Sequence, residues 1–171
     1  MKKYGRISNN ATHRDQIEPA LEFCNKVLNS SLFLDQVDSK RHDWEYLNGM
    51  PSDVRNEIEN FRREPIEIRT YRNARSSALA YTYLNADYLY LNTAKFDRST
   101  KSIGGSIAHE MMHCLGYGHG NNSRAGKQNS VPYWIGSAVR NFDFEGGIDL
   151  PPSPPRKYIP WYKRFWNWLR G

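Results

Sequence analysis

The chain has 171 residues, of which 39% are hydrophobic and 13% aromatic, enough to bury one compact core and to exclude a disordered chain. The formal net charge is +6, but residues 151–171 carry +5 of it and contain no acidic residue, so residues 1–150 are nearly neutral. We therefore predict one domain over residues 1–150 followed by a basic tail. No nucleic-acid binding is expected, because the domain has no basic stripe interleaved with aromatic residues.

The N-terminus begins with basic residues, but polar residues follow where a signal peptide would need an apolar run. No stretch of the chain approaches the roughly eighteen consecutive apolar residues that a membrane-spanning helix needs. We expect neither a classical signal peptide nor a transmembrane segment. This expectation favours a cytoplasmic protein or one that is released by a non-classical route.

Helices and strands are predicted in separate parts of the chain. Apolar residues recur at helical spacing over residues 17–28, and a second helix is expected from a cap at Ser52 to Phe61, before Pro65. Three segments rich in Ile, Tyr, Leu and Thr then read as strands: 66–71, 78–84 and 88–93. A short turn at 85–87 separates the last two strands.

After the strands, a helix is predicted from capping residues at 99–102 to a stop at Gly116. One face of this helix is apolar: Ile103, Ile107, Met111 and Leu115. Its C-terminal half carries the sequence HEMMHCLGYGH, residues 109–119, which holds three of the five histidines of the chain.

The spacing of these histidines indicates a metal site. His109 and His113 lie four residues apart and so face the same side of a helix. A positive φ at Gly116 would turn the chain sharply and bring His119 back as a third ligand. Three protein ligands leave the fourth position of zinc open, as in catalytic sites. Glu110 would lie beside the metal, where it can accept a proton from water.

These five residues reproduce the signature H-E-x-x-H-x-x-G-x-x-H, so the chain resembles the metzincin clan of zinc metallopeptidases. The chance of such a match in a chain of this length is on the order of 10⁻⁵. The resemblance implies an α+β fold: a small twisted mixed sheet with a backing helix and an active-site helix, above an irregular lower part with a short C-terminal helix. It also implies that an extended protein or peptide substrate pairs with an edge strand in 79–84.

One metzincin feature differs. Metzincins carry a methionine in a tight turn after the third histidine, and no methionine of this chain follows His119. The best substitute is SVPYW, residues 130–134, in which Pro132 would replace the methionine and Trp134 would fall where some families have a metal-facing tyrosine. Tyr133 is expected in the wall of the substrate pocket, with binding of the oxyanion or the metal as the alternative.

From these features we predict a zinc-dependent endopeptidase. His109, His113 and His119 would hold zinc, and Glu110 would activate a zinc-bound water for attack on the peptide bond. One alternative is a zinc amide hydrolase that acts on a non-protein or cell-wall substrate. Another is a non-catalytic surface-binding protein on the same fold. The presence of Glu110 favours catalysis, because binding alone needs no general base. We expect a monomer.

The cysteines and the acidic residues near the C-terminus are weaker candidates. Cys24 and Cys114 allow at most one disulfide, and we expect two reduced, buried thiols. The alternative is that the Cys24 thiolate masks the metal in a latent form. Asp143, Glu145 and Asp149 could bind calcium, but their spacing matches no ordered loop motif and predicts a solvated turn.

The tail combines a stiff linker, PPSPP at 151–155, with a segment rich in basic and aromatic residues at 156–171. A helix that starts at Pro160 would be amphipathic, with tryptophans on one side and cations on the other. Such a helix could dock on an anionic membrane surface or an acidic partner. We favour packing against the domain, because so short a helix is marginal in isolation.

Overall fold

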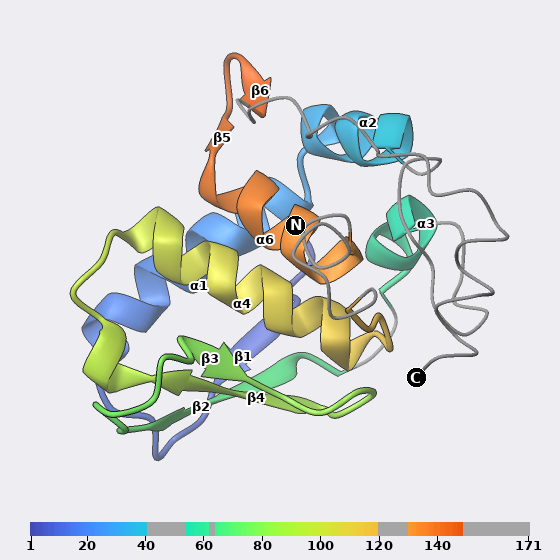
Figure 1. The fold of residues 1–171 in the computed structure, drawn as a ribbon. Helices are drawn as coiled ribbons and strands as arrows, with labels where there is room; N and C mark the ends of the chain where they lie inside the picture. The colour runs from blue at the N-terminus through green and yellow to red at the C-terminus, as the bar shows by residue number, and fades with distance from the viewer. Residues whose placement is uncertain (41–53, 62–63, 120–129, 149–171) are drawn as a thin grey trace, which may run out of the picture.

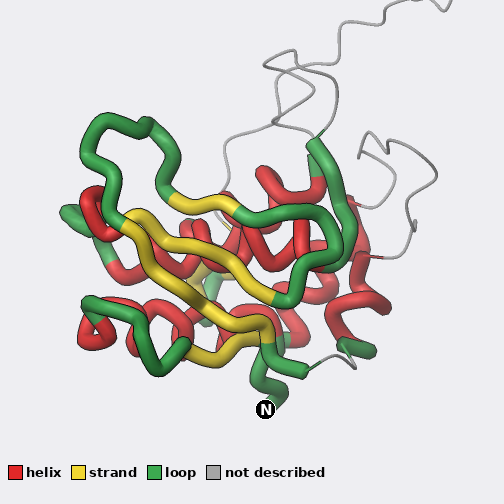
Figure 2. Tube along the Cα trace, turned by 90° about the horizontal axis from the view of Figure 1, so that it is seen from below, coloured by secondary structure: helices red, strands yellow, loops and turns green. Residues whose placement is uncertain are grey.

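The computed structural model describes residues 1–40, 54–61, 64–119 and 130–148. In this part of the chain, five α-helices accompany a four-stranded mixed sheet and a two-stranded sheet. The protein is therefore mixed α+β, as predicted. Helices α1 (Arg14–Leu28) and α4 (Thr100–Cys114) lie on the same face of the larger sheet (Figure 1). Figure 2, seen from below, shows the strands in front and the helices behind.

The four strands of the larger sheet lie in the spatial order β1 (Gly5–Ile7), β2 (Ile66–Tyr71), β4 (Tyr88–Asn92) and β3 (Ala80–Tyr81). The first three are parallel to one another, and Ile68 of β2 lies opposite Leu89 of β4. Strand β3 is antiparallel to β4 and forms one edge of the sheet, with Ala80 opposite Leu91. The sheet therefore presents one short antiparallel edge beside two longer parallel strands.

Side chains of the two longest strands alternate between the two faces. Those directed at the helices are buried: Ile66, Ile68, Leu89 and Leu91. The residues between them are partly exposed, as the two-residue period of a strand requires. Strand β2 has its predicted bounds, and β4 is one residue shorter than predicted. Of the predicted strand 78–84, only Ala80–Tyr81 joins the ladder.

The backing helix α1 and the motif helix α4 follow the sequence prediction closely. Four predicted core residues of α1 are buried: Ile17, Leu21, Cys24 and Leu28. Helix α4 begins after Ser99, whose hydroxyl accepts a hydrogen bond of 3.2 Å from the backbone N–H of Ser102. Figure 1 shows α4 between the sheet and helix α6 (Val131–Arg140), so the motif helix is held from both sides.

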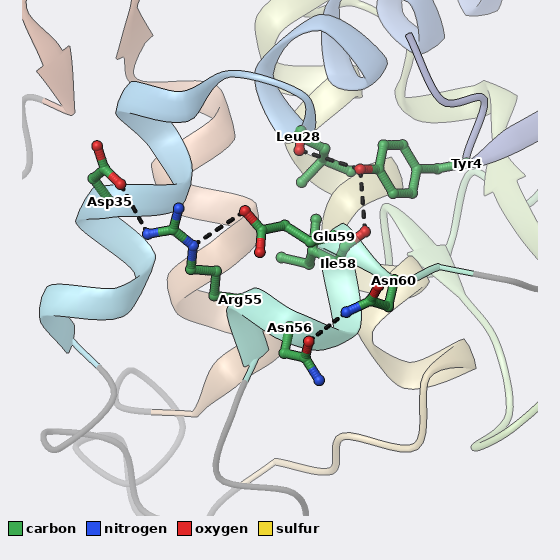
Figure 3. Close-up of polar contacts among 8 residues, drawn as sticks. All are labelled: Tyr4, Leu28, Asp35, Arg55, Asn56, Ile58, Glu59 and Asn60. Carbon is green, nitrogen blue, oxygen red and sulfur yellow. Dashed lines mark hydrogen bonds and ion pairs between the residues drawn. The ribbon is translucent and has the colours of Figure 1, made fainter.

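Two short helices extend the core beyond the sheet: α2 (Ser31–Lys40) and α3 (Val54–Glu59). Helix α2 was not predicted, and α3 ends before the predicted limit at Phe61. Strand β1 was not predicted either. Tyr4, directly before β1, connects the sheet to helices α1 and α3. Its buried hydroxyl lies 3.2 Å from the carbonyl oxygen of Leu28 and 3.3 Å from that of Ile58 (Figure 3).

An ion-pair bridge links α2 and α3. The guanidinium of Arg55 donates to Asp35 of α2 at 2.8 Å and to Glu59 of its own helix at 3.2 Å (Figure 3). All three side chains are at least partly exposed to solvent. Because exposed ion pairs contribute little, each about 0.2–1 kcal/mol, the burial of Val54 and Ile58 is the main reason for the packing of α3.

The region after the histidine motif differs from the prediction. Residues 130–134 do not form a separate tight turn, because Val131 begins helix α6. Ser130 occupies the N-cap position in an extended conformation, and Pro132 lies in the first turn, where its missing N–H is not needed. The expected irregular lower part thus contains a ten-residue helix. A small hairpin of β5 (Phe142–Asp143) and β6 (Gly147–Ile148) follows it.

Several predictions fall outside the described residues: the cap at Ser52, the linker at 151–155 and the tail helix from Pro160. The division into a domain over 1–150 and a tail stays a prediction. Within the described part of the chain, no helix has the length and apolar character needed to cross a membrane.

Candidate metal centre

The three histidines of the motif lie together. His109 and His113 project from successive turns of α4, with ring centroids 5.1 Å apart. His119 lies beyond the end of the helix, yet its ring centroid is 5.1 Å from that of His109 and 4.4 Å from that of His113. One nitrogen from each ring lies within 4.8 Å of the other two. The structure therefore brings together the ligand set expected from the sequence.

Gly116 produces the turn that returns His119 to the helix. Its φ of 94° lies in the left-handed region that glycine adopts without strain. The backbone N–H of Gly116 donates to the carbonyl oxygen of His113, and that of Tyr117 donates to the carbonyl oxygen of Met112. These bonds satisfy carbonyl groups at the end of α4. The glycine stop predicted from the sequence is confirmed.

The outer nitrogen atoms of the rings are held by neighbouring groups. His113 Nδ1 lies 2.7 Å from the carbonyl oxygen of Tyr117, and His119 Nδ1 lies 3.3 Å from the hydroxyl of Ser130. The ring of His109 forms a hydrogen bond with the backbone of Pro132. A carbonyl oxygen can only accept, so the Nδ1 atom of His113 carries its proton and Nε2 keeps a free lone pair.

The inner nitrogen atoms are spaced as a small cation requires. The Nε2 atoms of His113 and His119 are 3.1 Å apart. Two nitrogen ligands of a tetrahedral zinc ion, each at 2.0–2.1 Å from it, lie about 3.3 Å apart. The three-histidine group can therefore hold a metal ion, and its all-nitrogen ligand set suits zinc, copper, iron or nickel.

Burial favours the neutral form of the His109 and His113 rings. Burial, with the neighbouring charges of His113 and His119, lowers the pKa of His109 to about 3. Burial also lowers the pKa of His113 below its ordinary value, although the hydrogen bond with Tyr117 partly opposes this. Because only the neutral imidazole can bind a metal, these shifts favour the ligand form at neutral pH.

Glu110 lies next to the first ligand and is not part of the ligand group. Its side chain is 7% exposed, and burial raises its pKa to about 7. A hydrogen bond from the backbone of Thr82 partly offsets this shift by stabilising the carboxylate. Thr82 follows edge strand β3, so the sheet edge holds the carboxylate in place. A carboxyl group with a pKa near neutrality can both accept and release a proton.

The histidines and Glu110 line one cleft, with a volume of about 770 Å³. One wall consists of residues 77–84, which contain edge strand β3. The other walls are formed by α4 and α6, and by Gly118 and His119 after α4. An extended chain that entered this cleft would pass between the sheet edge and the histidines.

Tyr133, rather than Trp134, faces the metal centre. The Tyr133 ring centroid is 4.8 Å from those of both His109 and His119. Trp134 is 9% exposed and packs near Phe33, with centroids 6.5 Å apart. Tyr133 lines the cleft, as expected, whereas Trp134, at the sequence position where some metzincins have a metal-facing tyrosine, lies in the core. Helix α6 turns consecutive side chains by about 100°, so Trp134 points to the core when Tyr133 points to the cleft.

The remaining candidates do not join the centre. Cys24 and Cys114 are both buried and form no disulfide, as expected, and among the described residues Cys24 is not part of a metal-binding group. The structure therefore gives no support to a latent form in which the Cys24 thiolate masks the metal. Asp143 accepts a hydrogen bond from the backbone N–H of Glu145 at 3.2 Å, and both are exposed in the turn of the β5–β6 hairpin. Asp149 lies outside the described residues.

Three residues of the centre were not assigned a role from the sequence: Thr82, Tyr117 and Ser130. Two of them act through the backbone, which any residue type provides, so the sequence carries no signal for them. For Ser130 a signal exists, since serine directly before apolar residues at helical spacing indicates an N-cap. That interpretation would have placed a helix, with Ser130 at its start, against the histidines.

No family model matches the chain, and no curated protein and no solved structure matches it significantly. The assignment of a function therefore rests on the geometry of His109, His113, His119 and Glu110 in their cleft.

Proposed function

We propose that this protein is a zinc-dependent endopeptidase. His109, His113 and His119 would hold the ion, and Glu110 would serve as the general base. The observation that carries the proposal is the position of the Glu110 carboxylate, on the same helix and in the same cleft as three converging imidazoles. Three protein ligands leave a coordination position open for chemistry, whereas structural zinc sites are closed by four.

The residues of the chain would act in sequence on a water molecule and a peptide bond. The bound metal would supply a Lewis acid that polarises the scissile carbonyl and lowers the pKa of water. Glu110 would accept a proton from the attacking water and later deliver it to the leaving nitrogen atom. The hydrogen bond from Thr82 would keep the carboxylate pointed at the cleft between these two transfers.

The edge of the sheet supports a peptide as the substrate. Among the described strands, β3 pairs only with β4, so one side of its backbone can pair with an added strand. Residues 77–84 line the cleft beside the histidines. A peptide that paired with this edge would lie extended across the metal centre. Tyr133 would form the opposite wall, with its ring against His109 and His119.

The metzincin resemblance adds support to this proposal. The fold expected from it, a small mixed sheet with a backing helix and a motif helix, agrees with the arrangement of β1–β4, α1 and α4. The glycine turn before the third histidine also agrees. On these grounds we propose a metzincin-like class, with a helix start at residues 130–134 in place of the methionine turn.

The two alternatives from the sequence fit less well. A hydrolase of small non-protein amides would have no use for a free strand edge along its cleft. A binding protein without activity would have no use for a buried carboxylate, which costs free energy to desolvate. The non-protein hydrolase stays the second choice, because the cleft itself does not exclude a cell-wall peptide.

Cleavage of a peptide library tests the proposal. The full chain is incubated with the library after loading with zinc, after treatment with a chelator, and after zinc is restored. We expect internal cleavage that the chelator abolishes and zinc restores. Cleavage that persists in chelator, or no cleavage of any peptide by the zinc-loaded chain, would contradict the assignment.

A further inference from the structure

The cleft has a positively charged end that the proposed chemistry does not use. Arg140, the last residue of α6, lines this end and is exposed. Within the described part of the chain, its side chain makes no hydrogen bond or ion pair. Among the described residues that line the cleft, Glu110 is the only acidic one, and it lies at the histidines. The charge of Arg140 is therefore not neutralised by the cleft itself.

The packing of α4 against α6 opens the space in front of Arg140. Gly105 of α4 packs directly against Gly136 of α6, and the Cβ atom of Arg140 lies 3.1 Å from where a Cβ at Gly105 would be. Ser106 and Ser137 also line the cleft here. Two glycines and two serines thus line the same part of the cleft as Arg140, and the hydroxyl group of Ser137 can donate a hydrogen bond.

A second guanidinium stands behind Ser106. Arg98 Nη1 donates to the Ser106 hydroxyl at 2.6 Å and to the carbonyl oxygen of Ser102 at 3.2 Å. Its Nε and Nη2 atoms are buried and have no hydrogen-bond partner. Burial, and to a lesser extent the charge of Arg140, lower the pKa of Arg98 to about 10. The two cations are thus near enough to repel each other, and among the described residues neither forms an ion pair with a carboxylate.

This arrangement is costly in the free protein. Like charges repel, and a buried charged group with unmade hydrogen bonds is destabilising. A bound anion would relieve the repulsion, since it would attract both cations and accept hydrogen bonds from Arg140 and Ser137. A carboxylate matches the fork of an arginine in shape and charge.

We propose that this end of the cleft, formed by Arg140, Ser106 and Ser137 with Arg98 behind them, binds the carboxylate of an Asp or Glu side chain of the substrate. The proposal rests on the proposed peptidase function and names its substrate preference. Arg140 would be a specificity residue and would take no part in bond cleavage.

The geometry places the acidic residue close to the scissile bond. Arg140 follows Tyr133 by seven residues, which is about 10 Å along a helix. An extended peptide advances about 3.3 Å per residue, so this distance corresponds to about three residues. The preferred acid would therefore lie within roughly three residues of the cleaved bond, on the side that faces the N-terminal half of α4.

Matched peptides test this preference. Peptides identical except for Glu, Gln or Lys at each position flanking the cleaved bond are compared with the zinc-loaded full chain. We expect kcat/KM to be about tenfold or more higher for Glu than for Gln at one position, equivalent to about 1.4 kcal/mol, and lowest for Lys. In Arg140→Ala, which retains the Cβ that packs beside Gly105, this Glu-to-Gln ratio should fall to near one.

The matched control is Arg72→Ala. Arg72 is exposed, follows β2 and does not line the cleft, so this variant loses the same charge elsewhere. It should keep both the activity and the Glu-to-Gln ratio of the original protein. Arg140→Lys should keep a part of the preference, because the charge remains but the fork is lost. Equal ratios in the original protein and in Arg140→Ala would overturn the proposal.

A binding measurement separates this proposal from the peptidase assignment. N-acetylglutamate amide and N-acetylglutamine amide are titrated into the zinc-loaded chain and followed by NMR. We expect the glutamate compound to bind more tightly, and this advantage to vanish in Arg140→Ala. An advantage that survives in the variant, as carboxylate binding to the metal would produce, would overturn the anion subsite. If the advantage vanishes while no peptide is cleaved, the subsite stands and the peptidase function fails.

Discussion

Gly105 and Gly136 face each other where α4 crosses α6. A Cβ atom at Gly136 would lie 2.8 Å from the carbonyl oxygen of Gly105 and 2.9 Å from the Cβ of His109. The backbones of the two helices therefore approach more closely than any larger residue permits. This contact places Ser130, Pro132 and Tyr133 at the histidines, so the metal centre depends on two glycines that bind nothing.

Gly136→Ala should damage stability and metal binding together. The added methyl group has to push α6 away from α4, and overpacking of this kind costs about 1–3 kcal/mol. The displacement should also move Ser130 and Pro132 away from the rings of His119 and His109. We expect the melting temperature to fall by several degrees, at about 2–4 °C per kcal/mol, and zinc affinity to fall as well. Both are measured by thermal unfolding with and without zinc.

Gly146→Ala is the control for this substitution. A Cβ at Gly146 would meet only Asp143 Oδ2, at an ordinary contact distance of 3.7 Å. The melting temperature and the zinc affinity of this variant should match those of the original protein. An equal loss of stability in both variants would contradict the claim that the close approach of α4 and α6 requires glycine at position 136.

The three-histidine group should bind one zinc ion per chain. His119→Ala removes the ligand that Gly116 returns to the helix and should lower zinc occupancy strongly after dialysis. His13→Asn is the matched control, because His13 is exposed at the start of α1 and its positive φ of 58° is tolerated by asparagine. Metal content is measured by mass spectrometry. Full zinc occupancy in His119→Ala would contradict the site.

Ser130 should act as a positioning residue for the metal. Its hydroxyl lies 3.3 Å from His119 Nδ1 and helps to orient the ring. Loss of such an outer partner typically lowers metal affinity about 10–100-fold. We expect this loss in Ser130→Ala, measured by competition with a chelating dye, and partial recovery in Ser130→Thr, which restores the hydroxyl. Unchanged affinity in Ser130→Ala would contradict this positioning role.

Stability should fall at alkaline pH because of Cys24. Burial raises the pKa of this thiol from 9.0 to about 12, so above pH 9 the unfolded chain loses a proton that the folded chain retains. The stabilising contribution is complete below pH 9 and is lost as the pH rises toward 12, at about 1.4 kcal/mol per pH unit. Urea unfolding at pH 8, 9 and 10 should show a smaller loss for Cys24→Ala than for the original protein.

Identical pH dependence in the two proteins would contradict the burial of Cys24. Between pH 9 and 10 the comparison is specific, because Tyr4, whose pKa burial raises from 10.0 to about 12, contributes mainly above pH 10.

The parts of the fold that were predictable carry long periodic signals. Helices α1 and α4 repeat apolar residues over four turns, and β2 alternates over six residues. Strand β1 has three residues, too few for a period, and forms only because β2 offers it a partner. The edge strand β3 is shorter than predicted, because only Ala80 and Tyr81 form the ladder with β4.

Helix α6 was missed although its signal is present. Val131, Trp134, Ile135, Ala138 and Val139 recur at helical spacing and are buried. At residues 130–134 the metzincin resemblance predicted a tight turn, although the helical spacing of these apolar residues indicates a helix. The metal ligands were predictable because the spacing of His109, His113 and His119 encodes their geometry. The anion subsite was not, because only the crossing of α4 and α6 brings Ser106 and Arg140 together.

The rate of peptide cleavage by zinc-loaded Glu110→Gln tests the central claim most directly. Glutamine keeps the shape of the side chain but cannot accept the proton of the attacking water. The variant should bind zinc as the original protein does and lose at least about 10²–10⁴-fold in kcat, the contribution typical of a general base. Cleavage at the original rate by a variant that retains its zinc would contradict the role of Glu110 and, with it, the proposed mechanism.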